Sequence, residues 1–564
     1  MTRPTNLIYS VDEVPPPTIL IISAVQHVAV MAITLIFPLI LAREANLSEI
    51  QVLDLVSLSM LGLGFATVCF SIRSHFVGSG YLSPAAYTAI YLGPSLFALR
   101  RGGLDLVFGM TITAGIIQLG VAPLLKRLRA LLPSEIAGLV IAIVGLALAS
   151  LGVRYSLGID NNQSIKPEYV IVAGASLTTM CILNIWTKGY GKMFCVLIGI
   201  VVGYVVSFAI GILDLSTIVP NSGVVLFRLP RLDHVGFSFD AYLLAPFMVA
   251  SLAATLRVMG DISNAQRLND SDWVRPSFTS LAGGVSANGI AMIFCGLVGS
   301  FGINSYSSSI GLSGATGVTS RSVGYAIGAG FAILALVPPA AAVFAAMPLP
   351  VMGAALFFTA AFVLTSGLQM ITARMLDARK NLVIGFSFAM AVVADIYHDA
   401  LTAVPLVLQP IFGNALVLGT ICAVLLNLIT RIGVRQRVSI KLAPGGINRE
   451  AVEQFLSEHG ARWAARRDVI NRATFGVVQL LEILGDPPDG IEVEASFDEF
   501  NLDVRVKYLG IPLEIPERKP TPREIVASAD GERLLAGYLL RRSADRITSR
   551  RSGDVAEVVL HYDH

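Results

Sequence analysis

A polar stretch inside an apolar region decides the fold of this chain, Gly302-Ile303-Asn304-Ser305-Tyr306-Ser307-Ser308-Ser309-Ile310-Gly311. Residues 304–309 bring together five hydroxyl side chains and one amide. A second interrupted stretch precedes the apolar residues 85–99, Gly78-Ser79-Gly80-Tyr81-Leu82-Ser83-Pro84. Because lipid offers no hydrogen-bond partners, irregular backbone at membrane depth is tolerated only where protein buries it or where it lines a cavity. The two stretches therefore predict two broken helices that form one polar site, as in transporters built from inverted repeats.

The composition is that of a membrane protein with a soluble end. Of the 564 residues, 54% are hydrophobic and 14% are charged, and the mean hydropathy is +0.70. Soluble domains carry about 25% charged residues, so an ordinary water-soluble enzyme is excluded, and so is a disordered chain. The net charge of +2 is too small to suggest a nucleic-acid partner. Residues 434–564 hold 19 of the 41 Lys and Arg and 21 of the 39 Asp and Glu, which predicts a soluble domain there.

The sequence carries no motif for catalysis or for a bound cofactor. Its five cysteines are scattered through apolar sequence without metal-ligand spacing, which argues against a zinc site or a disulfide framework. It also contains no phosphate-binding loop, nucleophile elbow or zinc-peptidase motif. We therefore expect no enzyme activity, no metal and no cofactor.

Twelve apolar stretches are long enough to cross a bilayer. They lie near residues 18–41, 50–72, 102–124, 133–153, 168–187, 193–214, 238–260, 279–300, 324–346, 349–372, 381–398 and 404–430. Together with the two broken segments they give fourteen membrane segments, which fits two inverted repeats of seven. Lys and Arg number twelve in one set of alternate loops and seven in the other, which predicts that both termini are cytoplasmic.

Polar residues inside the spans are candidates for a solute site, because they are costly in lipid. Gln26 and His27 lie within the first span, where they could contact a solute or join two helices through a hydrogen bond. Arg257 and Asp261 are four residues apart at the end of the eighth segment, so they share a helix face and could pair. Arg257 could instead mark the cytoplasmic end of its helix. A cation facing the site would favour an anionic or acceptor-rich solute.

The remaining candidates belong to the broken segments themselves. Serine side chains could cap a half-helix and leave backbone N–H groups free for a ligand, although the stretch could also be a polar loop at the membrane surface. The candidate site residues in these segments are Tyr81, Ser307, Ser308, Ser309 and Gly311.

With these residues in view, positions 17–430 resemble the nucleobase–cation symporters of the xanthine/uracil permease (nucleobase–ascorbate) family. The resemblance rests on four motifs in the expected order, which are Gln26-His27, Gly260-Asp261, Gly299-Ser300-Phe301 with Ile310-Gly311-Leu312 and Thr316-Gly317-Val318, and Pro338-Pro339 with Met347-Pro348-Leu349-Pro350-Val351-Met352-Gly353. It implies fourteen segments divided into a core domain (segments 1–4 and 8–11) and a gate domain (5–7 and 12–14). It also implies a solute between segments 3 and 10, an elevator-like shift, a homodimer, and coupling to protons or sodium in the cell inner membrane.

Four positions depart from the pattern of this family. The substrate-binding Glu of the eighth segment falls on Arg257, the Gln or Glu of the signature on Ser308, its Asn on Ser309, and an acidic residue of the ninth segment on Asn288. A carboxylate that would accept hydrogen bonds from a base is thus replaced by a guanidinium that can only donate them. Arginine also cannot couple transport to its own protonation. We therefore predict a purine-like, anionic solute such as urate. The alternatives are another small anion, or a sensor that binds a solute and signals through its C-terminal domain.

The domain organisation follows from the same patterns. We predict a cytoplasmic N-terminus (1–16), a permease domain (17–430), a linker (431–446) and a cytoplasmic α/β domain (447–564). Within the last domain the patterns predict helices at 450–459, 462–484 and 532–542, and strands at 491–497, 502–509 and 554–562. This order resembles, in degraded form, the ATP-binding fold of histidine kinases and anti-sigma-factor kinases. Glu482 matches that fold, but its Asn is replaced and little lid glycine remains. An unrelated regulatory or dimerising domain is the alternative.

Overall fold

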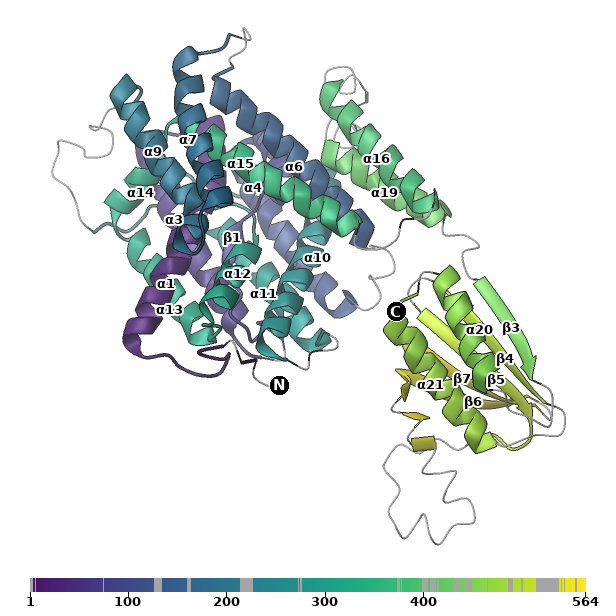
Figure 1. Cartoon of the computed structure of the whole chain (residues 1–564). Helices are drawn as coiled ribbons and strands as arrows, with labels where there is room; N and C mark the ends of the chain where they lie inside the picture. Colours follow the sequence, from purple (N-terminus) through teal and green to yellow (C-terminus); the bar gives the residue numbers. More distant parts are fainter. Residues whose placement is uncertain are drawn as a thin grey trace. The chain divides into compact units, whose positions relative to one another are not determined.

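The computed structural model divides into two compact units, Met1–Leu426, which we call the membrane unit, and Asn427–His564, the tail unit (Figure 1). The structure describes residues 4–5, 7–74, 76–125, 134–159, 164–213, 227–271, 273, 276–372, 376, 378–397, 404–405, 412, 415–430, 436–442, 449–463, 465–484, 490–498, 501–513, 537–538, 540–541, 543–552 and 555–563.

Helices follow the apolar stretches of the sequence. They are α1 (Pro17–Ala32), α2 (Ile36–Glu44), α3 (Glu49–Ser71), α4 (Leu92–Val121), α6 (Ser134–Leu157), α7 (Pro167–Trp186), α8 (Tyr190–Met193), α9 (Cys195–Ile210), α10 (Leu244–Asn269), α11 (Phe278–Leu297), α12 (Ser307–Thr316), α13 (Arg321–Ala335), α14 (Pro338–Ala345), α15 (Leu349–Ile371), α16 (Ala378–Ile396) and α19 (Ala415–Thr430). Short 3₁₀ turns are η1 (Ile33–Leu35), η2 (Ala89–Tyr91), η3 (Ala122–Leu124) and η5 (Ala241–Leu243). Within the described ranges, eight helical segments are long and apolar enough to cross a membrane, and one bent pair could add a ninth.

Two of these helices differ from the sequence prediction. The helix α10 continues to Asn269, so Arg257 and Asp261 lie inside it and not at its end. The predicted span 324–346 is two helices, α13 and α14, bent by 84°. The second helix begins at Pro338, which has no N–H to continue the preceding helix and is favoured at a first helical position.

The two interrupted stretches meet as a pair of short strands, where the sequence predicted helix alone. Strand β1 (Ala85–Tyr87) pairs antiparallel with β2 (Ile303–Ser305). The N–H groups of the first and last β1 residues donate to the hydroxyls of Thr67, at 3.1 Å, and Thr34, at 3.2 Å. Each interrupted stretch therefore supplies hydrogen-bond partners for the other, which is the condition for irregular backbone at membrane depth.

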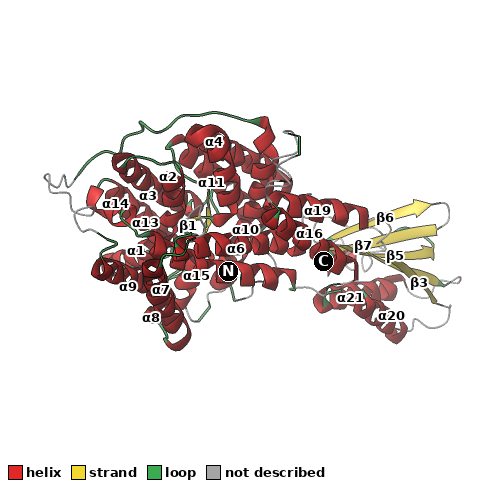
Figure 2. Ribbon diagram, turned by 90° about the horizontal axis from the view of Figure 1, so that it is seen from above, coloured by secondary structure: helices red, strands yellow, loops and turns green. Residues whose placement is uncertain are grey.

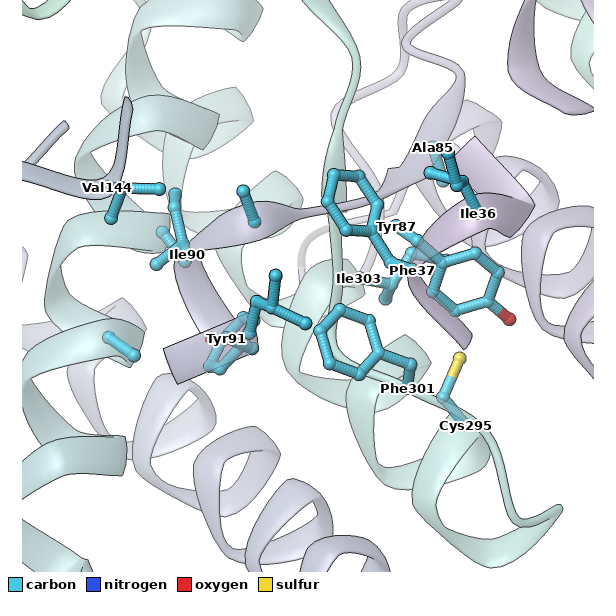
Figure 3. Close-up of a cluster of buried hydrophobic side chains, with 14 of the residues drawn as sticks. Ile36, Phe37, Ala85, Tyr87, Ile90, Tyr91, Val144, Cys295, Phe301 and Ile303 are labelled. Atoms are coloured by element: carbon cyan, nitrogen blue, oxygen red, sulfur yellow. The ribbon is translucent and has the colours of Figure 1, made fainter. Parts of the chain in front are cut away.

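Aromatic side chains pack around this strand pair (Figure 3). The ring of Phe301 lies 6.2 Å from the rings of Phe37 and Tyr87, measured between centroids, and all three side chains are buried. Gly302 lies beside Tyr91, and a Cβ placed on it would come within 2.5 Å of that ring. The strands are thus fixed by packing as well as by hydrogen bonds.

The helices of the membrane unit form two packing groups. Helices α3, α4, α10, α11 and α13 contact one another, whereas α15 packs on α6, α7 and α9. The contact of α6 with α15 uses small residues, as is usual where membrane helices approach closely. A Cβ on Gly367 would lie 2.5 Å from the Ala142 nitrogen and 2.7 Å from the Gly138 carbonyl oxygen.

We expect Gly367→Val to lower the melting temperature of the purified protein by several degrees. Overpacking of a tight contact costs about 1–3 kcal/mol. The matched control is Gly385→Val in α16, where an added Cβ meets nothing within 4 Å. Thermal unfolding in detergent measures both, and equal melting temperatures for the two variants would contradict the close approach of α6 and α15.

The tail unit is a five-stranded antiparallel sheet with two helices, α20 (Arg449–Arg462) and α21 (Arg467–Leu484), on one face (Figures 1 and 2). Its strands, in the order β3-β4-β5-β7-β6, are β3 (Gln436–Leu442), β4 (Ile491–Phe497), β5 (Asn501–Leu509), β7 (Val555–Asp563) and β6 (Arg546–Ser552). Strand β3 lies in the predicted linker and β6 was not predicted. Most of the predicted helix 532–542 lies outside the described residues. Cross-strand ion pairs such as Lys507–Glu494 (3.3 Å) lie on the partly exposed face, whose polar side chains alternate with buried apolar ones along β5.

Candidate functional site

A cavity of about 70 Å³ lies beside the strand pair. Its walls come from η1 and α2, from β1 and the two residues after it, from Ser305 and Tyr306 at the end of β2, from Arg257, and from α15. Both interrupted segments therefore contribute to one cavity, together with helices of both packing groups. Ligand pockets for drug-sized molecules measure about 300–1,000 Å³, so this cavity is much smaller than such a pocket.

Arg257 supplies the charge among the described residues that line this cavity. It extends from the middle of α10 and is partly exposed. The ion pair with Asp261 that the spacing allowed is not seen among the described residues, where the Asp261 carboxyl oxygens accept hydrogen bonds from serine hydroxyls. The guanidinium is thus available to a solute as a donor of hydrogen bonds.

Asp261 holds the second interrupted segment against α10. Its two carboxyl oxygens accept hydrogen bonds from Ser305 Oγ, at 2.6 Å, and from Ser307 Oγ, at 2.5 Å. The side chain is buried, with 7% of the residue exposed. One carboxyl group therefore fixes both the last residue of β2 and the first residue of α12. This geometry makes Asp261 a residue that positions the site.

His27 connects the first span to α12. Its Nδ1 lies 2.5 Å from Ser309 Oγ and its Nε2 lies 3.4 Å from Ser313 Oγ. The ring is buried. His27 thus forms a hydrogen bond between the first span and α12. The described lining of the cavity does not include His27 or Ser309.

The other candidates lie further from the cavity. Gln26 is partly exposed on α1, and Ser308 and Gly311 lie on the exposed face of α12. Tyr81 is buried and packs in a small apolar cluster with Ile310 of α12. None of the four belongs to the described lining.

Three threonines that the sequence analysis did not select line the cavity, namely Thr34, Thr88 and Thr359. Thr34 follows His27 by seven residues, which is two helical turns, so helical spacing from His27 could have found it. Thr88 follows β1, and its N–H donates to the Gly302 carbonyl at 3.2 Å. Thr359 lies in an apolar helix without a sequence signal of this kind.

Asn288 belongs to a buried amide network outside the described lining of the cavity. Its Nδ2 donates to Gln118 Oε1 at 2.7 Å, and Gln118 Nε2 donates to the Ser251 carbonyl at 3.3 Å and to Tyr91 at 3.4 Å. All four residues are fully buried. The network joins α4, α10 and α11 through neutral side chains, so it offers no proton-binding carboxylate.

Known proteins match the membrane unit over most of its length. The model of a permease family, Xan_ur_permease, matches residues 18–399. The uric acid transporter UacT of Escherichia coli (strain K12) is 29% identical over 438 residues, which cover 75% of this chain and 88% of that protein. The xanthine permease XanP of the same organism is 25% identical over 444 residues, which cover 76% of this chain and 95% of that protein.

A solved structure shares the fold. The murine anion transporter Solute Carrier 26 family member A9, in the inward-facing state, superposes with a TM-score of 0.51. The superposition covers 76% of this chain and 71% of that one, at 12% sequence identity.

Proposed function

Because the chain belongs to the xanthine/uracil permease family, we propose that it moves a purine-like, anionic solute such as urate across the membrane. The coarser part of this statement follows from the family and from the apolar helices, since the chain is an integral membrane transporter of the nucleobase permease type and not an enzyme.

The proposal of an anionic solute rests on one observation, which is that Arg257 lines the cavity between the interrupted segments. A guanidinium presents N–H donors in a planar fork and no acceptor. The N–H groups of a neutral base would find no acceptor on this side chain, whereas an anionic heterocycle offers charged acceptors to its donors. The name of one relative, a uric acid transporter, agrees with this solute class.

We propose an elevator-like movement for transport. The cavity is bounded by α10 and the strand pair on one side and by α15 on the other, and these helices belong to different packing groups. The cavity must widen to admit a purine. A shift of one helix packing group along the other would widen it. The proposal includes fourteen segments in two inverted repeats, a homodimer, a place in the cell inner membrane, and cytoplasmic termini.

Uptake into proteoliposomes tests the solute class. We expect saturable uptake of radiolabelled urate, weaker uptake of xanthine and no uptake of uracil. Competition by chloride, bicarbonate or sulfate instead of urate would favour another small anion. Binding of urate without flux would favour a sensor. Uptake under proton and sodium gradients would identify the coupling ion.

Restoring the family residues tests the site. The double variant Arg257→Glu with Ser308→Gln should gain uptake of neutral bases, because it restores an acceptor and an amide. The single variant Ser308→Gln serves as control, since Ser308 is outside the described lining of the cavity. No gain for any base in the double variant would contradict the role given to Arg257.

We propose a regulatory role for the tail unit, in place of ATP hydrolysis. The matched Glu482 stands without the Asn of the kinase fold, and the sequence keeps little of the glycine of its lid. Nucleotide binding by the full-length protein, measured with radiolabelled ATP, tests this proposal. Turnover of ATP would overturn it.

A further inference from the structure

The N-terminal residues 7–13 lie against the membrane unit as an ordered strap. The N–H groups of Ile8 and Tyr9 donate to the Gly317 carbonyl, at 2.8 and 3.0 Å, and Tyr9 forms a parallel β-bridge with Val318. In return, the N–H of Thr319 donates to the Tyr9 carbonyl at 3.0 Å. We propose that this strap is a positioning element for the solute site, and the inference rests on the proposed function.

The strap fixes the end of α12 that lies away from the strands. The helix has ten residues, which is too short for stability on its own. At its N-terminus, β2 and the Asp261 contacts hold it. At its C-terminus it stops at Gly317 in a left-handed conformation (φ 69°), and the carbonyl of that residue is the one that the strap binds. Without the strap, the last turn would lose these two hydrogen bonds.

Val11 joins the three elements that carry the site. It is buried, with 8% exposed, in a cluster with Tyr81, Ala265 and Ile310. Tyr81 precedes β1, Ile310 belongs to α12, and Ala265 follows Asp261 by about one turn of α10. A buried side chain of the strap therefore shares one apolar cluster with both interrupted segments and with the helix that bears Arg257.

Asp12 adds ion pairs to the same arrangement. Its carboxylate lies 2.9 Å from the guanidinium of Arg321, which is the first residue of α13. It lies 3.4 Å from the guanidinium of Arg73, which stands between α3 and β1. The Asp12 side chain is about half exposed, and exposed ion pairs contribute little. The strap is therefore held by the buried side chains of Leu7 and Val11 and by the backbone hydrogen bonds, with Asp12 in a minor role.

Binding of radiolabelled urate to the full-length protein in nanodiscs tests the strap. We expect Val11→Asp to raise the dissociation constant at least tenfold, Val11→Ala to raise it about threefold, and Asp12→Asn to change it less than twofold. The matched control is Val14→Asp, three residues along and 73% exposed, which should bind like the wild type. Equal affinity in Val11→Asp and Val14→Asp would overturn the proposal.

Hydrogen exchange in the protein without solute separates this proposal from the proposed function. Amides of residues 307–321 should exchange faster in Val11→Asp and Val11→Ala than in Val14→Asp. Unchanged exchange would overturn the strap even if urate binds. Faster exchange in a protein that binds no urate would support the strap as a structural element and refute the urate proposal.

Discussion

Arg257→Gln should raise the half-saturation concentration for urate at least tenfold. The variant keeps a side chain of similar polarity but removes the charge from the cavity. A hydrogen bond to a charged group contributes about 1.5–3 kcal/mol, which corresponds to roughly 10–150-fold in affinity. Uptake into proteoliposomes, normalised to the amount of folded protein, measures the effect. Xanthine uptake should fall less than urate uptake, because the neutral base depends less on the charge.

The control for this experiment lies on the same helix. Arg267→Gln changes an exposed arginine in the last turn of α10, away from the described lining of the cavity. It should transport urate like the wild type. If both variants lose the same activity, the effect belongs to the overall charge of α10 and the proposed contact between Arg257 and the solute is wrong.

Asp261→Ala should abolish transport and destabilise the protein. The change removes the acceptor that the hydroxyls of Ser305 and Ser307 share, and Ser305 is buried with 1% of the residue exposed. Each unsatisfied buried polar group costs about 1–3 kcal/mol. We therefore expect a lower melting temperature together with a loss of solute binding, measured in the same preparation.

A double-mutant cycle shows whether Asp261 acts through these serines. The variant Ser305→Ala with Ser307→Ala should lose activity by itself, but adding Asp261→Ala should then cost far less than it does in the wild type. Ser263→Ala is a control on the same helix, since its hydroxyl donates to the Met259 carbonyl within the helix. Strict additivity of the Asp261 and serine effects would contradict the positioning role.

The sequence predicted the elements of the site better than their contacts. Hydropathy located the spans, because membrane thickness fixes their length, and the unusual hydroxyl cluster at 304–309 pointed to a break that the structure contains. It did not predict the short strands, since three residues such as Ala85–Tyr87 show no usable periodicity. The sequence also did not predict the bend at Pro338. Residues 324–346 are apolar throughout, and hydropathy does not report the direction of a helix.

Individual side-chain partners depend on tertiary packing. A spacing of four residues allows Arg257 to pair with Asp261. In the structure, the Asp261 carboxyl group instead accepts hydrogen bonds from Ser305 and Ser307 of the second interrupted segment. Helical periodicity contains no information about contacts with that segment. The cavity-lining Thr359 likewise becomes visible only when α15 is placed beside the strand pair. Strand β3 was predicted to be a linker because its stretch of sequence is basic and ends in Pro444-Gly445-Gly446.

The pairing of β1 with β2 has a consequence for biogenesis. The two strands are separated by more than two hundred residues, so a nascent chain inserts the first interrupted stretch long before its partner leaves the ribosome. During that interval, part of the β1 backbone has no strand beside it in an environment that penalises unpaired amides. Thr34 and Thr67 both precede β1 in the chain and are synthesised before it. Their hydroxyls can therefore accept hydrogen bonds from two of the β1 amides as soon as β1 is inserted. The two threonines would then stabilise the β1 backbone in the nascent chain during insertion as well as in the folded transporter.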